Sequence, residues 1–203
     1  MVKEWVNPKY LSEKEISKLA KAFKSAKPYP NFNFENFFNK KKLENLRKEI
    51  LKQEFIKHDK DLFSLSNTQE FTFTDNKAIK EFYSLLSGKE FINFMQRLTG
   101  EKPLKGIDMH AHSMKQGDYL LFHDDVVEGR KIAYIAYLAK GFAAKDGGRL
   151  QLFDVKNPRT PIVSVIPKFG SFAGFKVSEK SVHLVEEVMS DKNRLTVGGW
   201  FYG

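Results

Sequence analysis

The sequence predicts a mainly β fold with flanking helices, in which short strands form a barrel or a sandwich. Apolar residues recur at helical spacing in roughly the first hundred residues, whereas from about residue 109 onward they alternate with a period near two. Short Gly and Pro breaks separate the later segments, and no long linker divides the chain. We therefore expect one domain over 1–203, with helical support over about 1–105 and the strand core over about 106–203.

Helix signals mark the N-terminal half. Ser12 is predicted to cap the first helix, with Glu15 completing a capping box, and the prolines of Pro28–Pro30 end this helix. Phe32 and Phe34 then alternate with polar residues, as in a short strand. Three further helices are predicted, over Lys41–Lys57, Lys77–Leu86 and Glu90–Leu98.

The second half is predicted to form eight short strands. Without repeated interleaved helices, such a series is typical of a barrel or sandwich. The 19 Phe residues of the chain indicate an aromatic-rich core. The predicted strands are Met109–Met114, Tyr119–His123, Ile132–Ala139, Arg149–Phe153, Ile162–Ile166, Ser171–Phe175, Val182–Val188 and Arg194–Tyr202.

The composition excludes several kinds of site. The chain contains no Cys, which rules out disulfides, thiolate metal sites and a Cys nucleophile. No apolar run has the length of a signal peptide or a membrane span, so we expect no membrane partner and a location in the cytoplasm, the nucleus or both.

The net charge of +9 allows a nucleic-acid partner without requiring one. The favoured interpretation is that the excess lysines lie on solvated helix faces.

Two His residues and one Asp carry the strongest chemical signal. Residues i and i+2 of a strand point to the same face, so His123 and Asp125 can both face a metal while Asp124 points away. With His183 they supply two imidazoles and one carboxylate, the facial triad of non-haem Fe(II) oxygenases. His183 by itself would be interpreted as a core residue, so its assignment depends on the other ligands and on Arg194 downstream.

Arg194 begins an apolar C-terminal strand, where a buried guanidinium needs an anion. Its planar fork matches a carboxylate bidentately, which suits the far carboxylate of a 2-oxoglutarate co-substrate. Thr196 and Tyr137 are candidates for additional hydroxyl donors to that group. His110 and His112 form another i, i+2 pair, but we interpret them as ordinary strand residues because no third ligand is evident nearby. The residues thus predict an iron-dependent hydroxylase.

Several sequence blocks resemble the eukaryotic ribosomal prolyl hydroxylases. The most specific are HDDVVEGRKIAYIAYL from His123, DGGRLQLF from Asp146 and RLTVGGWFYG from Arg194. The segments SAKPYPNFNFENFF from Ser25 and DLFSLSNTQEF from Asp61 are also similar, so the resemblance covers most of the chain. It implies a double-stranded β-helix core, the jelly-roll or cupin-like fold, supported by the N-terminal helices.

The resemblance also implies roles for individual residues. Fe(II) would be bound by His123, Asp125 and His183, and the 5-carboxylate of 2-oxoglutarate by Arg194 and Tyr137. Fe(II), 2-oxoglutarate and O2 are therefore expected, with ascorbate as a further candidate cofactor. The known substrate of the family is a prolyl residue in a small-subunit ribosomal protein of the uS12 type, hydroxylated at C3.

Other residues near the site have two interpretations on the sequence alone. Asp124, Arg130 and Trp200 are candidate substrate contacts, and a structural role is the alternative for each. Met114 stands where relatives often have a Tyr, nine residues before the first iron ligand. Relatives usually carry a second, non-catalytic β-helix domain, whereas this sequence ends at Gly203, which leaves the protein substrate open.

Two alternative functions are also compatible with the sequence. The first keeps the chemistry but changes the substrate to a collagen-like or other Pro-rich peptide, hydroxylated at C4. The second is a non-catalytic β-helix domain that binds ribosomal or nucleic-acid partners through its basic surface. The presence of all three metal ligands and of Arg194 favours an enzyme.

Overall fold

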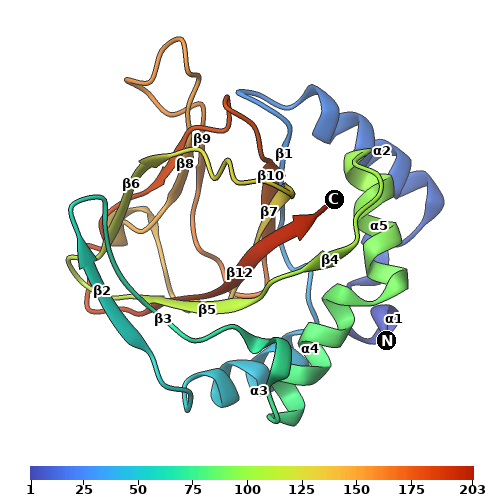
Figure 1. Cartoon of the computed structure of the whole chain (residues 1–203), viewed down its shortest axis with the longest axis horizontal. Helices are drawn as coiled ribbons and strands as arrows, with labels where there is room; N and C mark the ends of the chain where they lie inside the picture. Colours follow the sequence, from blue (N-terminus) through green and yellow to red (C-terminus); the bar gives the residue numbers. More distant parts are fainter.

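The computed structural model describes residues 1–203, and its twelve strands form one curled sheet (Figure 1). The helices are α1 (Val2–Trp5), α2 (Glu13–Ser25), α3 (Lys40–Ile50), α4 (Lys77–Ser87) and α5 (Lys89–Thr99), with 3-10 turns η1 (Pro8–Tyr10), η2 (Phe71–Phe73) and η3 (Ala144–Asp146). The strands are β1 (Asn31–Phe34), β2 (Ile56–Lys60), β3 (Phe63–Asn67), β4 (Gly106–Ile107), β5 (His110–Met114), β6 (Tyr119–His123), β7 (Arg130–Tyr137), β8 (Leu150–Leu152), β9 (Val163–Val165), β10 (Phe172–Lys176), β11 (His183–Val185) and β12 (Arg194–Tyr202).

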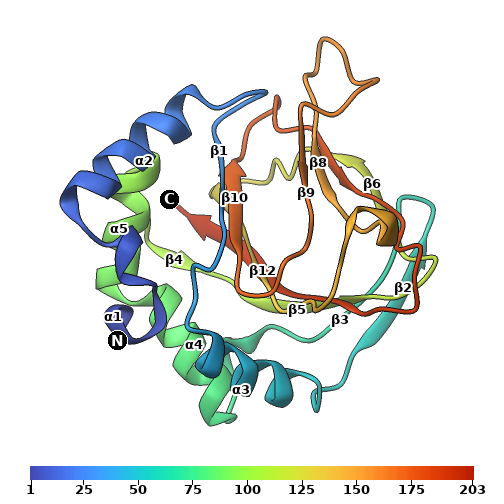
Figure 2. The same cartoon turned by 180° about the vertical axis from the view of Figure 1, so that it is seen from behind.

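The sheet bends into a nearly closed barrel, and the helices lie outside it. Its strand order is β1-β10-β7-β12-β5-β3-β6-β11-β8-β9, with β2 paired to β3 and β4 paired to β12, and neighbouring strands run antiparallel. Figures 1 and 2 show the helices on the side of the barrel formed by β1, β10, β7 and β12. No helix is long and apolar enough to pass through a membrane. The mainly β barrel with external helices is confirmed.

The central strands β7 and β12 divide the interior into two cores. Along β7, Tyr134 and Ala136 belong to a core of 34 buried residues that lies between the sheet and the helices. Ala133 and Tyr137 belong to a smaller core of 11 buried residues inside the barrel. This alternation follows from the period-two geometry of a strand. The barrel interior is therefore separated from the helical layer by one sheet.

Aromatic side chains join the helices to the sheet. Phe172 on β10 is fully buried, and its ring centroid lies 5.0 Å from that of Phe37 and 5.2 Å from that of Phe32. Phe38 and Phe91 also contact it, with centroid distances of 5.4 Å and 5.9 Å. Aromatic pairs at such distances add about 0.5–1.5 kcal/mol beyond the burial of their area. The expected aromatic-rich core is present.

Most predicted elements of the chain are found, with small differences at their ends. The strands predicted over Tyr119–His123 and Arg194–Tyr202 have those bounds as β6 and β12. The Ser12 side chain caps α2 by accepting the Glu15 N–H at 3.2 Å. The predicted capping box is incomplete, because the Glu15 carboxylate pairs with Lys18 at 3.6 Å rather than with the Ser12 N–H.

The helix predicted over Lys41–Lys57 is too long. It ends at Ile50, and the following segment forms the hairpin of β2 and β3, which the sequence analysis missed. Because β2 is exposed along most of its length, it lacks the apolar alternation that marks a half-buried strand. Strand β1 agrees with the short strand expected at Phe32 and Phe34, whereas β2 and β3 are two further strands that we did not predict for the mostly helical N-terminal half.

We predict that Phe172→Ala destabilises the protein strongly, because truncating this ring leaves a cavity at the junction of helices and sheet. Phe→Ala substitutions in cores typically cost about 3–5 kcal/mol. Phe73→Ala is the matched control, since the Phe73 side chain is 94% exposed and its loss should change the free energy of unfolding by about 0.5 kcal/mol or less. Chemical denaturation of the two variants and the wild type measures both effects. Equal losses would contradict this account of the core.

Candidate metal centre and co-substrate pocket

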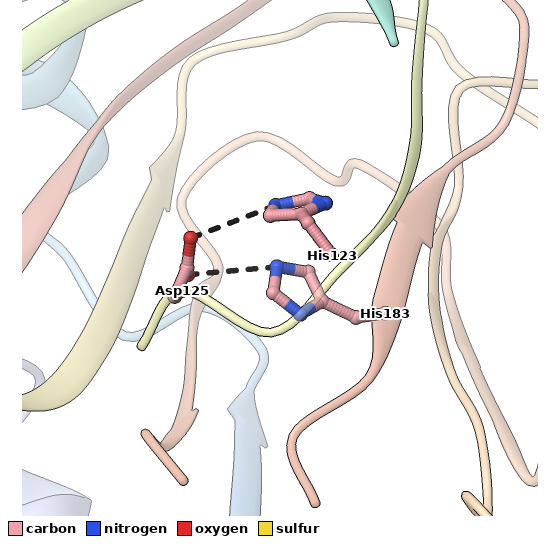
Figure 3. Close-up of side chains that lie close together, drawn as sticks. All are labelled: His123, Asp125 and His183. Atoms are coloured by element: carbon pink, nitrogen blue, oxygen red, sulfur yellow. Dashed lines mark ion pairs between the residues drawn. The ribbon is translucent and has the colours of Figure 1, made fainter. Parts of the chain in front are cut away.

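The structure brings the side chains of His123, Asp125 and His183 together, facing one another (Figure 3). His123 ends β6 and His183 begins β11, and the two residues are directly paired across these strands. The Nε2 atoms of His123 and His183 lie 3.6 Å and 3.5 Å from the two carboxylate oxygens of Asp125. The potential ligand atoms all lie within 4.8 Å of one another, so a single cation can contact all three side chains.

Asp125 reaches this site by a different route from the one we predicted. Strand β6 ends at His123, so simple strand alternation does not place the Asp125 side chain. Its φ is +66°, in the left-handed region that Asp adopts more readily than most other non-glycine residues. The predicted pair is thus brought together, but a turn after the strand directs the carboxylate toward the histidines.

Backbone carbonyls orient both imidazoles. His123 Nδ1 lies 2.7 Å from the Leu121 carbonyl oxygen, and His183 Nδ1 lies 2.7 Å from the Ser181 carbonyl oxygen. When Nδ1–H donates to a carbonyl, Nε2 keeps its lone pair free for a metal. Burial, followed by the neighbouring His123, lowers the pKa of His183 to about 4. His183 is therefore neutral near pH 7, which is the form that binds metal ions.

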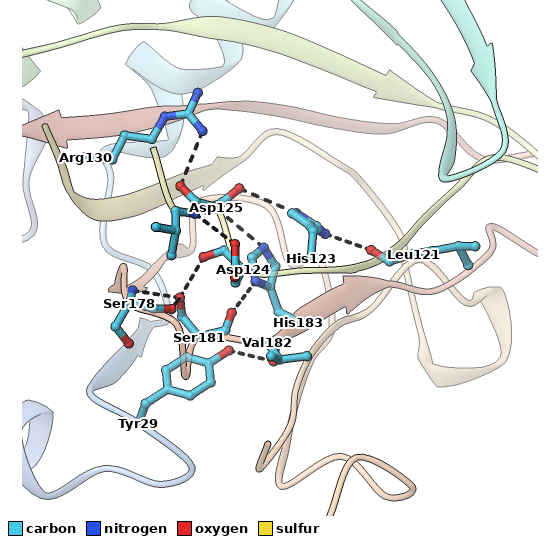
Figure 4. A network of polar contacts seen from close by, with 11 residues as sticks. Tyr29, Leu121, His123, Asp124, Asp125, Arg130, Ser178, Ser181, Val182 and His183 are labelled. Carbon is cyan, nitrogen blue, oxygen red and sulfur yellow. Dashed lines mark hydrogen bonds and ion pairs between the residues drawn. The ribbon is translucent and has the colours of Figure 1, made fainter. Parts of the chain in front are cut away.

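Ser181 connects the two segments that carry the ligands (Figure 4). Its buried hydroxyl lies 2.7 Å from the carbonyl oxygen of Asp124, to which it can donate, and it accepts the Ser178 N–H at 2.9 Å. Its carbonyl accepts the hydrogen bond from His183. One residue therefore connects the turn that precedes Asp125 to the start of β11.

A cavity of about 290 Å³ extends from the triad into the barrel. Eleven of its 19 lining residues are hydrophobic, so the space is mostly apolar. The polar side chains that line it include the triad and, on β12, Arg194 and Thr196. Such a cavity suits a small molecule that is held by a few placed polar groups.

Arg194 and Tyr137 supply unpaired donors deep in the barrel. Both side chains are buried, and neither Arg194 Nη2 nor the Tyr137 hydroxyl has a hydrogen-bond partner in the protein. Arg194 Nε donates to the Gly148 carbonyl at 2.6 Å, and its Nη1 lies 3.5 Å from the Met114 sulfur. The guanidinium lies 5.6 Å from the centre of the Tyr137 ring. An anion between the two groups would satisfy both orphaned donors.

The pKa shifts of this pair agree with an anion site. Burial raises the pKa of the Tyr137 hydroxyl, which therefore remains protonated and able to donate. Burial lowers the pKa of the Arg194 guanidinium, as expected for a buried cation that lacks a counter-ion. Thr196 pairs with Tyr137 across β12 and β7 and lines the same cavity, so the third predicted co-substrate residue is also brought to this place.

The three candidate substrate contacts are placed differently. Trp200 lines the cavity, and the Arg130 guanidinium carbon lies 3.3 Å from the centre of a Trp200 ring. Arg130 Nε and Trp200 Nε1 are both buried without a partner. Asp124 is not brought into the cavity, because its carboxylate accepts the Val126 N–H at 3.0 Å within its own turn.

The sequence analysis missed His112, which lines the cavity, and three further residues show why others were missed. Phe63 and Leu65 of β3 line the cavity, and their period-two spacing was the available signal for that strand. Ser181 is the third, and a serine two residues before His183 has no distinctive pattern. His110 and His112 do share a face of β5, with ring centroids 6.2 Å apart, but neither joins the triad.

The residues present fit both Fe(II) and 2-oxoglutarate. Two neutral imidazoles and a carboxylate are a suitable ligand set for Fe(II), and the cavity beside them leaves one side of a bound ion accessible. The orphaned donors of Arg194 and Tyr137 fit a carboxylate at the other end of a small dicarboxylic acid.

We predict that Ser181→Ala weakens metal binding about 10- to 100-fold, although Ser181 offers no ligand atom. The substitution removes the bond to the Asp124 carbonyl but keeps the backbone carbonyl that orients His183. Ser178→Ala is the matched control, since the Ser178 groups bonded to Ser181 are backbone atoms. Calorimetric titration with Mn(II) measures the difference. Equal affinities for the two variants would refute a positioning role for Ser181.

We predict that Arg194→Ala weakens binding of 2-oxoglutarate by about 2–5 kcal/mol, the usual effect of truncating one partner of a buried charge pair. The residue lies outside the triad, so the affinity for Mn(II) should remain near that of the wild type. Titration of the Mn(II)-loaded proteins with 2-oxoglutarate tests this expectation. An unchanged affinity for 2-oxoglutarate would remove Arg194 from the site.

Comparison with known sequences agrees with this geometry. Residues 109–202 match the family described as the 2OG-Fe(II) oxygenase superfamily. The chain is 33% identical over 181 residues to a prolyl 3-hydroxylase OGFOD1 of Xenopus laevis, covering 87% of this chain and 35% of that protein. It is 34% identical over 197 residues to a prolyl 3,4-dihydroxylase OGFOD1 of Ostreococcus tauri, covering 86% and 38%. The chain thus spans little more than a third of the length of these relatives.

Comparison with solved structures supports the fold. A prolyl-4-hydroxylase of Pseudomonas putida superposes with a TM-score of 0.72 at 17% identity, covering 91% of this chain and 98% of that one. A prolyl hydroxylase of Trichoplax adhaerens, solved with a peptide of hypoxia inducible factor, gives a TM-score of 0.71 at 13% identity and covers 95% and 96%. The jelly-roll fold, the facial triad and the sequence match lead to the same assignment. The chain therefore carries a 2OG-Fe(II) oxygenase domain, matched over residues 109–202.

Proposed function

We propose that this chain is a 2-oxoglutarate-dependent prolyl hydroxylase that modifies a protein. The observation that carries this proposal is the presence of the triad and of the unpaired Arg194 guanidinium around one cavity, with the unpaired Tyr137 hydroxyl on the ring beside that guanidinium. The curated relatives named as prolyl hydroxylases support the prolyl substrate class. Bound Fe(II), 2-oxoglutarate and O2 together supply the oxidation of a C–H bond to C–OH.

The side chains of the cavity have distinct tasks in this reaction. His123, Asp125 and His183 hold the metal through atoms on one side of it, and the carbonyls bonded to the two Nδ1 atoms keep both rings in place. Arg194 and Tyr137 donate to the far carboxylate of the co-substrate, which orients its other end toward the triad. The apolar lining limits access of water.

Trp200 and Arg130 are proposed to hold the substrate segment. Trp200 offers an apolar ring surface for a pyrrolidine ring, and the stacked Arg130 guanidinium restricts its orientation. The unpaired Arg130 Nε and Trp200 Nε1 are donors suited to backbone carbonyls of a polypeptide. Asp124 is assigned a structural role instead, because its side chain stabilises the turn that presents Asp125.

Within this class, we propose a uS12-type small-subunit ribosomal protein, hydroxylated at C3, as the substrate. The resemblance of the His123, Asp146 and Arg194 sequence blocks to ribosomal prolyl hydroxylases supports this choice, as does the name prolyl 3-hydroxylase of the Xenopus laevis relative. A cytoplasmic or nuclear location would suit such a substrate. Ascorbate is proposed only as a reductant that keeps the iron in the Fe(II) state.

We expect the protein with Fe(II) and 2-oxoglutarate to add one oxygen atom to a prolyl residue of a uS12 loop peptide, detected by mass spectrometry. Amino-acid analysis of the product should find 3-hydroxyproline. His123→Ala removes one metal ligand and should abolish both the product and the accompanying succinate.

Other outcomes would change the assignment. Hydroxylation of a Pro-rich repeat peptide alone, at C4, would replace the ribosomal substrate with a collagen-like one. If the wild-type protein binds no iron and produces no succinate with either peptide, the domain is a binding module rather than an enzyme. Product formation by His123→Ala at the wild-type rate would exclude the triad as the catalytic centre.

A further inference from the structure

His112 is a polar side chain that lines the proposed co-substrate cavity without a partner of its own. It lies on β5 directly opposite Thr196 of β12, and both residues line the cavity together with Arg194. Paired residues on neighbouring strands project to the same face, so the imidazole shares the face of the Arg194 guanidinium. His110, His123 and His183 make ring hydrogen bonds, whereas neither nitrogen of His112 makes one.

The neighbouring histidine of the same strand shows what is unusual about His112. His110 is two residues earlier on the same face, but it does not line the cavity. Its Nδ1 meets the Thr68 carbonyl oxygen at 3.4 Å, so its polar group is satisfied within the protein. His112 also lies outside the group of potential metal ligands. A molecule bound in the cavity is therefore the available hydrogen-bond partner for its imidazole.

We propose that His112 is a co-substrate-binding residue whose imidazole N–H donates a hydrogen bond to an oxygen of bound 2-oxoglutarate. The inference rests on the co-substrate placement proposed above, between the triad and Arg194. Met114, the next cavity residue of β5, offers only a thioether, which accepts hydrogen bonds weakly and donates none. His112 is therefore the polar donor that β5 contributes to this cavity.

The charge state of His112 suits this role. Burial, followed by the nearby His110 and Arg194, lowers the pKa of His112 to about 4. Near pH 7 the ring is neutral and has one N–H donor and one acceptor nitrogen. It can therefore bind an anion without placing a second cation beside the buried guanidinium, where like charges would repel. A lysine at this position would add that repulsion.

The test compares binding of 2-oxoglutarate by Mn(II)-loaded wild type, His112→Phe, His112→Asn and His110→Phe, using calorimetry. Phe keeps a ring of similar size but has no polar atom, so we expect its dissociation constant to rise about tenfold, as for loss of one hydrogen bond to a charged group. Asn retains an N–H donor and should stay within about threefold of wild type. His110→Phe is the matched control and should bind as the wild type does.

The affinities of these variants distinguish a hydrogen bond from His112 to 2-oxoglutarate from a packing contact. Equal affinities for wild type and His112→Phe would overturn the proposal, and so would equal losses in the Phe and Asn variants. If the wild type itself binds no 2-oxoglutarate, the co-substrate placement fails and the role of His112 fails with it. Mn(II) affinity and thermal unfolding are measured on every variant. If His112→Phe fails to fold, His112→Leu takes its place as the apolar variant.

Discussion

The pairing of β12 between β7 and β5 is the constraint on which the rest of the structure depends. Through it, Leu195, Val197 and Phe201 pack against the helical core. Arg194 and Thr196 alternate with these residues along β12 and line the cavity. One strand therefore joins the helices to the barrel and also carries the buried Arg194 guanidinium of the cavity. A shift of one residue in this register would turn the apolar residues toward the cavity and Arg194 toward the helices. Both the helical core and the cavity would then be disrupted.

The candidate metal centre is organised mainly by the backbone. Both imidazoles of the triad are oriented by carbonyl groups, and the Ser181 hydroxyl connects the turn before Asp125 to the start of β11. The pairing of β6 with β11 and the bond from Ser181 to the Asp124 carbonyl hold these segments together. The ligand positions are therefore established before a cation arrives, which reduces the conformational entropy that binding must offset.

The cavity interior combines an apolar lining with an uncompensated buried cation. Leaving Arg194 Nη2 and the Tyr137 hydroxyl without partners is unfavourable for the free protein. The same arrangement favours a bound carboxylate, because the cost of desolvating the donors has already been met during folding. It resembles the general pattern in which active sites are less stable locally than the surrounding core.

The sequence by itself determined the alternating strands, the capping of α2 and the identity of the triad and of Arg194, because these depend on local periodicity and on rare residue types. It did not determine the hairpin of β2 and β3, in which β2 is polar and exposed and β3 pairs with β5 and β6 far along the chain. Only the tertiary structure decided that Asp125 approaches the two histidines through a left-handed turn, that Ser181 supports this turn and that His112 lines the cavity. Such placements depend on contacts between distant segments, and no local pattern encodes them.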